Sequence, residues 1–346
     1  MKPKTAILLI NLGTPDSPGK FDVRKYLTQF LNDPRVIDIP WLLRKILVNL
    51  FIVPFRSTHS SNLYKQIWDK NTGSPLLMHS ENLKEKLQAS LGEDYQVGLA
   101  MRYQNPKMKT VLERMQKESY HKIIAIPLFP QYASSSTGSA AQHLMEIVSK
   151  WWVIPEIKII SQFYDNPDFI NCIVSRAKQL APSSYDHIVF SYHGLPERQV
   201  AKVHQNDTNC RDHNCEKEIN ADNYYCYKSA CYHTTRLIAK ELSLNENDYT
   251  TSFQSRLNKE WLTPFSDRVI ESLAKEGKKS VLVFSPSFTA DCLETLYEIK
   301  VEYEEIFQKN GGTDLVLVES LNSGNDWVNA LKRMIVLTLN EKQACS

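Results

Sequence analysis

The segment HIVFSYHGLPER, residues 187–198, predicts the fold of this chain. An apolar run is followed at once by a histidine, a glycine and a proline, so a buried strand ends in a sharp turn. The segment AILLINLGTPDS, residues 6–17, has the same outline, with LINLGTP in place of FSYHGLP. This repetition indicates that the chain contains two similar halves.

Two further segments continue the pattern of an apolar strand, a loop marked by proline or glycine, and the start of a helix. They are KIIAIPLFPQYASSSTGSA, from Lys122, and SVLVFSPSFTADCLE, from Ser280. Continuously apolar strands that alternate with amphipathic helices are typical of a parallel sheet covered on both faces. We therefore predict an α/β protein of two halves. Ligands of such folds bind beyond the carboxyl ends of the strands, where the four loops converge.

The length of 346 residues also favours two domains, since single cores rarely grow beyond about 250–300 residues. We place the first domain at residues 1–160, the second at 161–322, and a terminal helix at 323–346 that packs on either half. Hydrophobic residues make up 42% of the chain and charged residues 23%, which is ordinary for a folded soluble protein. The formal charge of +2 favours no nucleic-acid partner. The oligomeric state is left open.

Residues 39–55, IPWLLRKILVNLFIVPF, form the most apolar stretch. Arg44 and Lys45 interrupt it, and it is shorter than the roughly 20 apolar residues that span a bilayer. It is either a buried helix or an exposed apolar lip that receives an apolar ligand or rests on a membrane surface. The opening MKPKTAILLINLG is interpreted as a first strand rather than a secretory signal. We therefore expect a cytoplasmic protein, peripheral at most to the inner membrane face.

His193 stands at the end of its predicted strand, and the acidic segment SFTADCLETLYEI follows further along the chain with Asp291, Glu294 and Glu298. A neutral imidazole can accept a proton or bind a metal, and carboxylates hold a hard divalent ion. The pair therefore indicates chemistry that exchanges a divalent metal ion for protons. A packed structural histidine and a solvated acidic helix face are the alternatives.

The acidic residues lie in a segment predicted to be helical, residues 289–309, with Thr289 as its N-cap. At about 100° per residue, five carboxylates fall within a sector of roughly 80°: Asp291, Glu294, Glu298, Glu302 and Glu305. We assign the last two to a solvated face. Asp291 and Glu294 lie closest to the strand end, so a functional role is predicted for them.

The chain resembles the ferrochelatases, which insert ferrous iron into a porphyrin. The motifs that carry the resemblance stand in the family's order: LLINLGTP, GSPL, AMRYQNP, PLFPQYASSSTGS, SYHGLPER, FQSRLNKEWLTP and SFTADCLETLYEI. The resemblance implies two Rossmann-like halves with the active-site cleft between them. It also implies conversion of protoporphyrin IX to protohaem with release of two protons, the terminal step of haem biosynthesis. Fe²⁺ is then a substrate, and no nucleotide cofactor is needed.

The resemblance implies that His193 and Glu294 are the catalytic pair and face the macrocycle and the incoming Fe²⁺. Whether His193 mainly takes pyrrole protons or first binds iron is left open. Asp291 and Glu298 are implied to form a metal or proton route. Six further positions are implied to bind the porphyrin: Leu12, Arg56, Arg102, Tyr103, Tyr132 and Trp261. A chelatase that uses coproporphyrin or inserts cobalt or nickel, and a non-catalytic tetrapyrrole carrier, are the alternatives.

Four of the seven cysteines lie in an insert at residues 207–232: Cys210, Cys215, Cys226 and Cys231. In a reducing cytoplasm such clustering favours metal ligation over disulfides. Certain bacterial ferrochelatases hold a [2Fe–2S] cluster by cysteines in this region, and four thiolates are what such a cluster needs. Structural zinc, with His213 as an alternative ligand, and unligated cysteines are the other interpretations.

Overall fold

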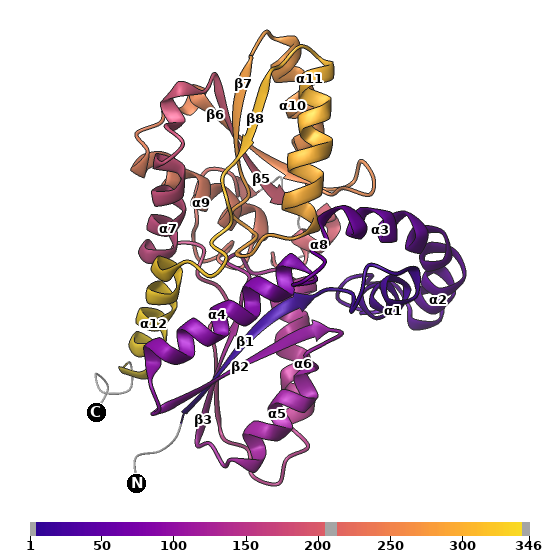
Figure 1. Ribbon diagram of the computed structural model, residues 1–346, viewed down its shortest axis with the longest axis vertical. Helices are drawn as coiled ribbons and strands as arrows, with labels where there is room; N and C mark the ends of the chain where they lie inside the picture. Colours follow the sequence, from indigo (N-terminus) through magenta and orange to yellow (C-terminus); the bar gives the residue numbers. More distant parts are fainter. Residues whose placement is uncertain (1–4, 205–212, 341–346) are drawn as a thin grey trace. The chain divides into compact units, whose positions relative to one another are not determined.

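The computed structural model describes residues 5–204 and 213–340. They fold into two compact units, each built on one sheet (Figure 1). The first unit takes the described residues of 1–129, 134–162 and 322–346. The second takes residues 130–133 and the described residues of 163–321.

The first unit is built on a four-stranded parallel sheet in the order β2-β1-β3-β4. Its strands are β1 (Thr5–Gly13), β2 (Tyr95–Tyr103), β3 (Lys122–Pro127) and β4 (Glu156–Ile159). β1 lies between two neighbours and is buried along nearly its whole length. Burial on both faces explains why its sequence is continuously apolar rather than alternating.

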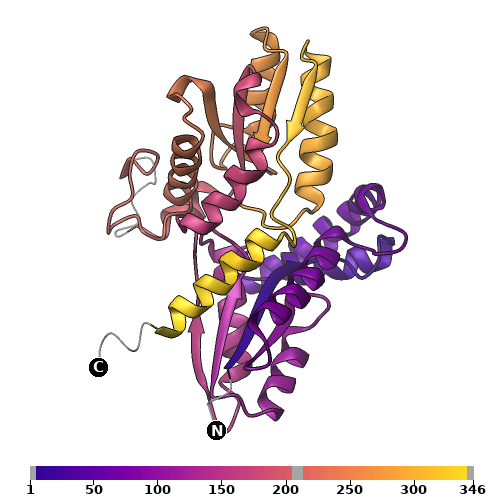
Figure 2. The ribbon, with the colours of Figure 1, turned by 60° about the vertical axis from the view of Figure 1, so that its left-hand side comes forward.

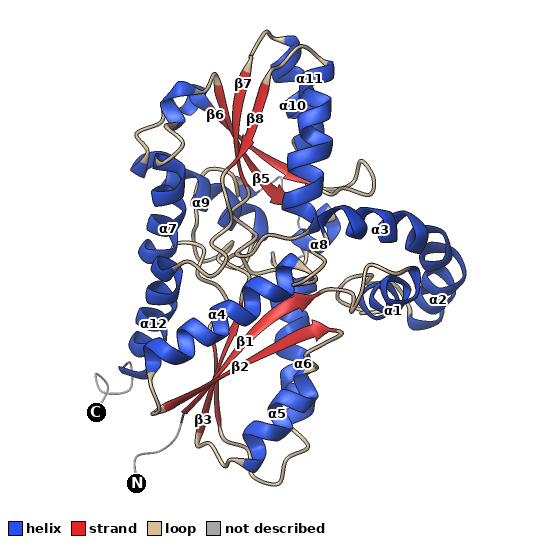
Figure 3. Cartoon of the chain, in the orientation of Figure 1, coloured by secondary structure: helices blue, strands red, loops and turns tan. Residues whose placement is uncertain are grey.

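Helices cover both faces of this sheet (Figure 3). On one face α5 (Met108–Lys117) and α6 (Ser139–Val148) share a core with Leu8 of β1. On the other face α4 (Pro75–Leu91) packs on β2 and on the terminal helix α12 (Asn325–Asn340). The Lys332 Nζ donates to the carbonyl oxygen of Ser90 over 2.6 Å. The terminal helix therefore belongs to the first unit.

A helical arm follows β1 in the first unit (Figure 2). It consists of α1 (Lys20–Leu31), α2 (Trp41–Ile46), η1 (Leu47–Ile52) and α3 (Val53–Ile67). Leu31, Val48 and Val53 form its small core. Many other apolar side chains of the arm are exposed: Trp41, Leu42, Leu43, Ile46, Leu47, Leu50, Phe51 and Phe55. Residues 39–55 are therefore an exposed apolar surface, one of the two arrangements that their sequence allowed.

Within residues 5–204 and 213–340, each helix is too short or too polar to span a bilayer.

The second unit repeats the topology of the first, with a parallel sheet in the order β6-β5-β7-β8. Its strands are β5 (His187–His193), β6 (Tyr249–Gln254), β7 (Ser280–Phe284) and β8 (Asp314–Leu317). β5 corresponds to β1, the two strands whose sequences predicted the repeat. The predicted α/β fold, with two parallel sheets flanked by helices, is confirmed.

Both faces of the second sheet are covered as well (Figure 1). On one face α10 (Ser266–Lys275), η7 (Glu294–Tyr303) and α11 (Glu304–Lys309) share a core with β5, β7 and β8. On the other face α7 (Pro167–Lys178) packs against α9 (Tyr227–Glu241). The short elements are η2 (Ser134–Gly138) in the first unit and η3 (Pro182–Ser184), α8 (Glu197–Ala201) and η6 (Glu246–Asp248) in the second.

Candidate functional site

His193 is the last residue of β5, at the carboxyl end of an inner strand of the second sheet. Its Nδ1 lies 2.6 Å from the carbonyl oxygen of Gly194. A carbonyl oxygen only accepts hydrogen bonds, so Nδ1 carries the proton and the lone pair of the neutral ring is on Nε2. Nε2 is therefore the atom that can accept a proton or bind a metal.

The backbone of His193 is held on both sides. Its N–H donates to Ser287 Oγ over 3.3 Å, and its carbonyl oxygen accepts from the Tyr227 hydroxyl over 2.8 Å. The rings of Trp261 and Phe288 have their centroids 6.4 and 6.3 Å from the imidazole centroid. The half-buried imidazole therefore sits in a largely aromatic setting on a rigid strand end, which suits a preorganised catalytic group.

Gly194 allows the chain after His193 to pack closely on β6. Its N–H donates to the carbonyl oxygen of Gln254 over 2.8 Å. A Cβ atom at this position would lie 2.8 Å from that oxygen and 3.3 Å from the Trp261 ring. Any side chain at residue 194 would thus separate the ends of β5 and β6, so the glycine is required by close packing.

The acidic segment is not the regular α-helix that was predicted. The helix begins at Leu293 rather than at Thr289, and the 10 residues Glu294–Tyr303 are π-helical. A π-helix has i→i+5 hydrogen bonds and more residues per turn than an α-helix, so the rotation of about 100° per residue does not apply. The predicted start at Thr289 was therefore wrong, and Asp291 lies outside the helix.

The carboxylates instead have different surroundings. Asp291 is buried before the helix and accepts a hydrogen bond from the Thr295 hydroxyl over 3.0 Å. Glu294 is half-buried at the first position of η7. Glu302 and Glu305 are exposed, as expected for a solvated face. Only the first part of the segment thus remains a candidate for chemistry.

Glu298 is half-buried and accepts four hydrogen bonds. Its Oε1 accepts from the Ser255 N–H over 2.7 Å and from the Tyr303 hydroxyl over 2.9 Å. Its Oε2 accepts from Gln254 Nε2 over 3.0 Å and from Ser255 Oγ over 2.5 Å. Burial raises the pKa of Tyr303 and the charge of Glu298 raises it further, so the phenol remains a donor. Glu298 as placed anchors η7 to the end of β6.

Gln254 connects the two segments that carry the predicted catalytic pair. Its side-chain Nε2 also donates to the backbone carbonyl oxygen of Glu294 over 3.1 Å. Its backbone carbonyl oxygen accepts from the Gly194 N–H. One residue therefore joins the strand end of His193 to the start of the helix of Glu294. Sequence reasoning did not single out Gln254, although it lies in the quoted motif FQSRLNKEWLTP.

Cys292 lies between Asp291 and Glu294 but keeps its proton. Burial raises the pKa of its thiol well above the usual value, and the neighbouring charges of Glu294 and Asp291 raise it further. A neutral thiol is a poor metal ligand.

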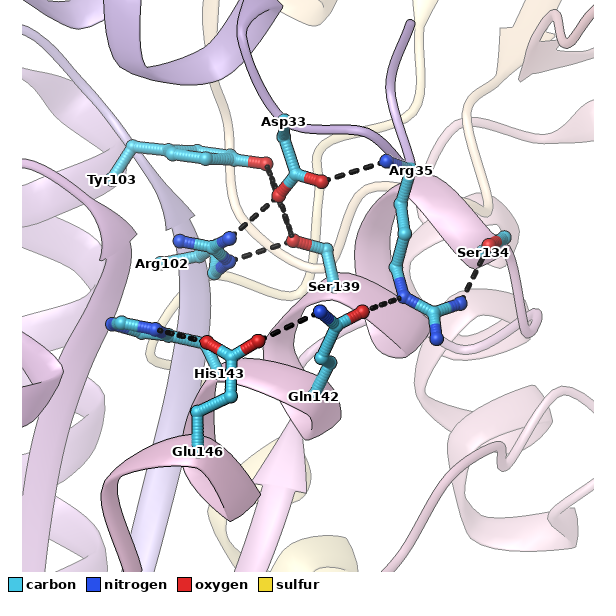
Figure 4. A network of polar contacts seen from close by, with 9 residues as sticks. All are labelled: Asp33, Arg35, Arg102, Tyr103, Ser134, Ser139, Gln142, His143 and Glu146. Carbon is cyan, nitrogen blue, oxygen red and sulfur yellow. Dashed lines mark hydrogen bonds and ion pairs between the residues drawn. The ribbon is translucent and has the colours of Figure 1, made fainter. Parts of the chain in front are cut away.

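Arg102 and Tyr103, two of the positions predicted to bind porphyrin, belong to a polar network in the first unit (Figure 4). Asp33 Oδ2 accepts from Arg102 Nη2 over 2.6 Å, from the Tyr103 hydroxyl over 2.8 Å and from Ser139 Oγ over 2.6 Å. The side chains of the Arg102–Asp33 ion pair are 18% and 3% exposed. Tyr103 is 2% exposed and its ring packs on that of Phe30. These two side chains thus hold Asp33 inside the unit.

The network continues through Arg35. Its backbone N–H donates to Asp33 over 2.8 Å, and its guanidinium donates to Gln142 and Ser134 over 2.5 and 2.9 Å. Burial alone would raise the pKa of Asp33, but hydrogen bonds from Ser139 and Arg35 and the charge of Arg102 together lower it. Asp33 is therefore an ionised anchor that joins the arm to β2 and α6.

The other predicted porphyrin positions are more accessible. Leu12 is half-buried near the end of β1, and Arg56 is exposed on α3. Tyr132 is half-buried, with its ring centroid 5.4 Å from that of Tyr225. Trp261 lies beside His193, as described above.

Two of the predicted ligand cysteines belong to a group of metal-ligand type whose histidine the sequence did not indicate. Cys215 and Cys226 are buried and lie with His204, so that one ligand atom from each is within 4.8 Å of the others. Cys231 is buried but is not in this group, and Cys210 lies outside the described residues. His204 was missed because it precedes the predicted insert.

Comparisons with known proteins identify the family of this chain. The sequence profile of the ferrochelatase family matches residues 4–339. The chain belongs to the ferrochelatase family. Members of this family are lyases that insert iron into porphyrin.

Two relatives illustrate the membership. A ferrochelatase of Coxiella burnetii (strain Dugway 5J108-111) is 43% identical over 334 residues, which cover 96% of this chain and 93% of that protein. A ferrochelatase of Legionella pneumophila (strain Paris) is 43% identical over 335 residues, covering 96% and 98%. Among solved structures, SirB from Bacillus subtilis with Fe³⁺ has a TM-score of 0.54 and 12% identity, covering 98% of each chain. The likeness to SirB shows the fold alone.

Glu298→Gln tests whether Glu298 is a structural anchor in this ferrochelatase-family chain. The amide NH₂ cannot accept the hydrogen bonds of two donors, so we expect the free energy of unfolding to fall by about 2 kcal/mol. Urea unfolding followed by tryptophan fluorescence measures it. The matched control is Glu302→Gln on the exposed side of the helix, which should change stability by less than about 0.5 kcal/mol. Equal small effects of both changes would contradict the anchoring role.

Asp33→Ala tests the buried network. It leaves the largely buried Arg102 guanidinium without its carboxylate, and we expect a loss of about 3 kcal/mol in the free energy of unfolding near neutral pH. Because folding lowers the pKa of Asp33, its stabilisation is present above its unfolded pKa of about 4 and is lost as pH falls through the folded value. The difference from wild type should therefore shrink in acid.

The control for Asp33→Ala is Asp16→Ala, which removes a partly exposed ion pair with Lys25. Its cost should be about 1 kcal/mol or less. An Asp33→Ala cost that matched this control, or that did not change with pH, would contradict the account.

Proposed function

We propose that this chain inserts Fe²⁺ into protoporphyrin IX and releases two protons, the terminal step of haem biosynthesis. The observation that carries the proposal is the position of His193, whose lone pair is on Nε2 and whose strand end is joined through Gln254 to the start of the Glu294 helix. Two pyrrole N–H protons must leave as the metal enters. The reaction therefore needs a proton acceptor and an oxygen ligand for a hard cation, the roles that we assign to His193 and Glu294.

In the proposed mechanism His193 Nε2 accepts a pyrrole proton, and the Glu294 carboxylate holds the incoming Fe²⁺. The hydrogen bond from Nδ1 to the Gly194 carbonyl stabilises the imidazolium that forms, because that acceptor remains in place after protonation. A planar macrocycle hides its nitrogen lone pairs until it is bent, so binding energy from aromatic contacts is best used to distort it. Trp261 and Phe288, beside His193, are suited to that contact.

Asp291 and Glu298 take different parts in this proposal. Asp291 is buried near Glu294 and belongs to the metal or proton route. Glu298 already accepts four hydrogen bonds, which favours a positioning role for it.

The remaining porphyrin-binding positions are proposed from the family resemblance and from the exposure of their side chains. Arg56 is an exposed cation suited to a propionate carboxylate, and Leu12 and Tyr132 offer partly accessible apolar surface. Arg102 and Tyr103 would act indirectly, by holding Asp33 and the arm.

The cysteine insert supports a separate proposal, that it holds a resident metal centre. The family resemblance implies a [2Fe–2S] cluster on Cys210, Cys215, Cys226 and Cys231. The described residues fit this set in part, because Cys215 and Cys226 lie together and Cys231 does not join them. A bound cluster would supply a one-electron redox group and would cross-link the insert. The proposed iron insertion needs no electron from it.

The decisive experiment is anaerobic turnover with wild type, His193→Ala and the control His121→Ala, which changes an exposed histidine directly before β3. Protoporphyrin IX, coproporphyrin III and a corrin precursor are each offered with Fe²⁺, Co²⁺ or Ni²⁺. We expect iron insertion into protoporphyrin IX, about 100-fold or more slower in His193→Ala and unchanged in His121→Ala.

Turnover that survives in His193→Ala would contradict the mechanism. Reaction only with coproporphyrin, cobalt or nickel would favour a related chelatase. Tight porphyrin binding with no turnover of any pair would favour a carrier.

We also propose a cytoplasmic protein that touches the inner membrane face through residues 39–55. The exposed apolar side chains of this stretch support membrane contact. Leu50→Glu should weaken binding to phosphatidylcholine–phosphatidylglycerol vesicles about tenfold, since it removes an apolar contact and adds a charge. Leu257→Glu, at an exposed leucine of the second unit, is the control. Equal binding of the two variants in sedimentation assays would contradict the proposal.

A further inference from the structure

His204, Cys215 and Cys226 form a buried group in the second unit that the iron-insertion chemistry does not use. Their exposed fractions are 4%, 0% and 1%. His204 follows α8, Cys215 lies in the turn region before α9, and Cys226 is the N-cap residue of α9. Three potential ligands from separate places in the chain thus meet away from solvent.

The spacing within the group suits one metal atom. The Nε2 of His204 lies 3.6 Å from the Sγ of Cys215. In a tetrahedral zinc site with Zn–S of about 2.3 Å and Zn–N of about 2.1 Å, the nitrogen and the sulfur are about 3.6 Å apart. An ion could therefore be bound by this pair with almost no movement of either side chain.

The surroundings of His204 argue against a purely structural histidine. Its buried Nδ1 has no hydrogen-bond partner among the described residues. Its Nε2 faces the Sγ of Cys215. A histidine retained for hydrogen bonding would have both nitrogens satisfied when buried. The ring is instead held by stacking on His213, with centroids 4.1 Å apart and planes at 5°.

Hydrogen bonds of Asn223 organise the loop between the two cysteines. Asn223 donates from Nδ2 to the carbonyl oxygen of Glu218 over 2.9 Å, and its own backbone carbonyl accepts from the Cys226 N–H over 2.8 Å. The same Nδ2 lies 3.9 Å from the Sγ of Cys215. A buried amide donor beside a sulfur is the kind of supporting contact that orients thiolate ligands.

Cys226 is held in place as the N-cap residue of α9, a helix of 15 residues. The loop and this helix thus bring two thiols and an imidazole to one point.

We infer that His204 is a metal ligand and that His204, Cys215 and Cys226 hold a thiophilic metal centre with mixed imidazole and thiolate ligation. This inference rests on the proposal of a resident metal centre in the insert, and it assigns a histidine where the family resemblance implies only cysteines. Binding of a divalent ion releases the two thiol protons. Zinc and an iron–sulfur centre both use these donors, and the measurement below distinguishes them.

The test begins with the full-length wild-type protein, purified anaerobically. Zinc, iron and acid-labile sulfide are measured per chain, and X-ray absorption at the edge of the metal found gives the ligand atoms. We expect about one centre per chain with nitrogen as well as sulfur neighbours, the nitrogen at about 2.0–2.1 Å if the metal is zinc. Iron with sulfide identifies a cluster, and zinc without sulfide a single ion. This arm needs no variant and so does not depend on a variant folding.

Variants then assign the histidine. His204→Ala should lower metal affinity by about 10–100-fold or more. Loss of a residue that only supports a ligand already lowers it by roughly that factor. His204→Cys should retain the metal with a changed absorption spectrum. Cys231→Ser and Cys172→Ser, two buried cysteines outside the group, should retain it unchanged, with circular dichroism confirming that each variant is folded.

The outcomes separate the two proposals. Wild type without zinc or iron would overturn both the resident centre and the assignment of His204. A centre with sulfur neighbours only, or one lost in Cys231→Ser and kept in His204→Ala, would overturn the assignment of His204 and favour four cysteines. Neither result depends on iron insertion into porphyrin, which is measured separately.

Discussion

The hydrogen bond from the Gly194 N–H to the carbonyl oxygen of Gln254 is the contact on which the candidate site depends. It joins the carboxyl ends of β5 and β6 and requires a residue without a side chain, since a Cβ atom would lie 2.8 Å from the accepting oxygen. The side chain of Gln254 then reaches the backbone of Glu294 and the carboxylate of Glu298. The position of the acidic helix therefore follows from the way in which two strand ends meet.

In the first unit, too, a glycine packs closely against the end of the neighbouring strand, but a different type of residue precedes it. Gly13 ends β1 with φ of 114°, and a Cβ atom there would lie 2.0 Å from the carbonyl oxygen of Tyr103, the last residue of β2. In both units a glycine thus packs against the end of the neighbouring strand. The residue before it is Leu12 in one unit and His193 in the other. The repeated backbone thus carries an apolar side chain at this position in one unit and a histidine in the other.

The anchoring carboxylates and the candidate catalytic histidine differ in their hydrogen bonding. Asp33 in the first unit and Glu298 in the second each accept several hydrogen bonds and join segments far apart in the sequence. Carboxylates whose oxygens already accept several hydrogen bonds hold neighbouring segments in position, because their lone pairs are already used. His193 differs from them, since its ring bonds to the Gly194 carbonyl through Nδ1, which leaves the lone pair on Nε2. The hydrogen bonds that a group already makes thus distinguish the anchoring carboxylates from the candidate catalytic histidine.

The sequence by itself determined the parallel α/β fold, its repetition, the family and the place of His193. Each of these depends on local patterns: strands buried on both faces are continuously apolar, and a histidine before Gly-Leu-Pro must stand at a strand end. Only the tertiary structure decided that the acidic segment is π-helical, that Tyr103 is buried on Asp33, and that His204 rather than Cys231 joins Cys215 and Cys226. These features depend on contacts between residues that are distant in the chain. The periodicity of a local segment carries no information about such contacts. Side-chain roles in this protein therefore follow from which neighbours the fold supplies.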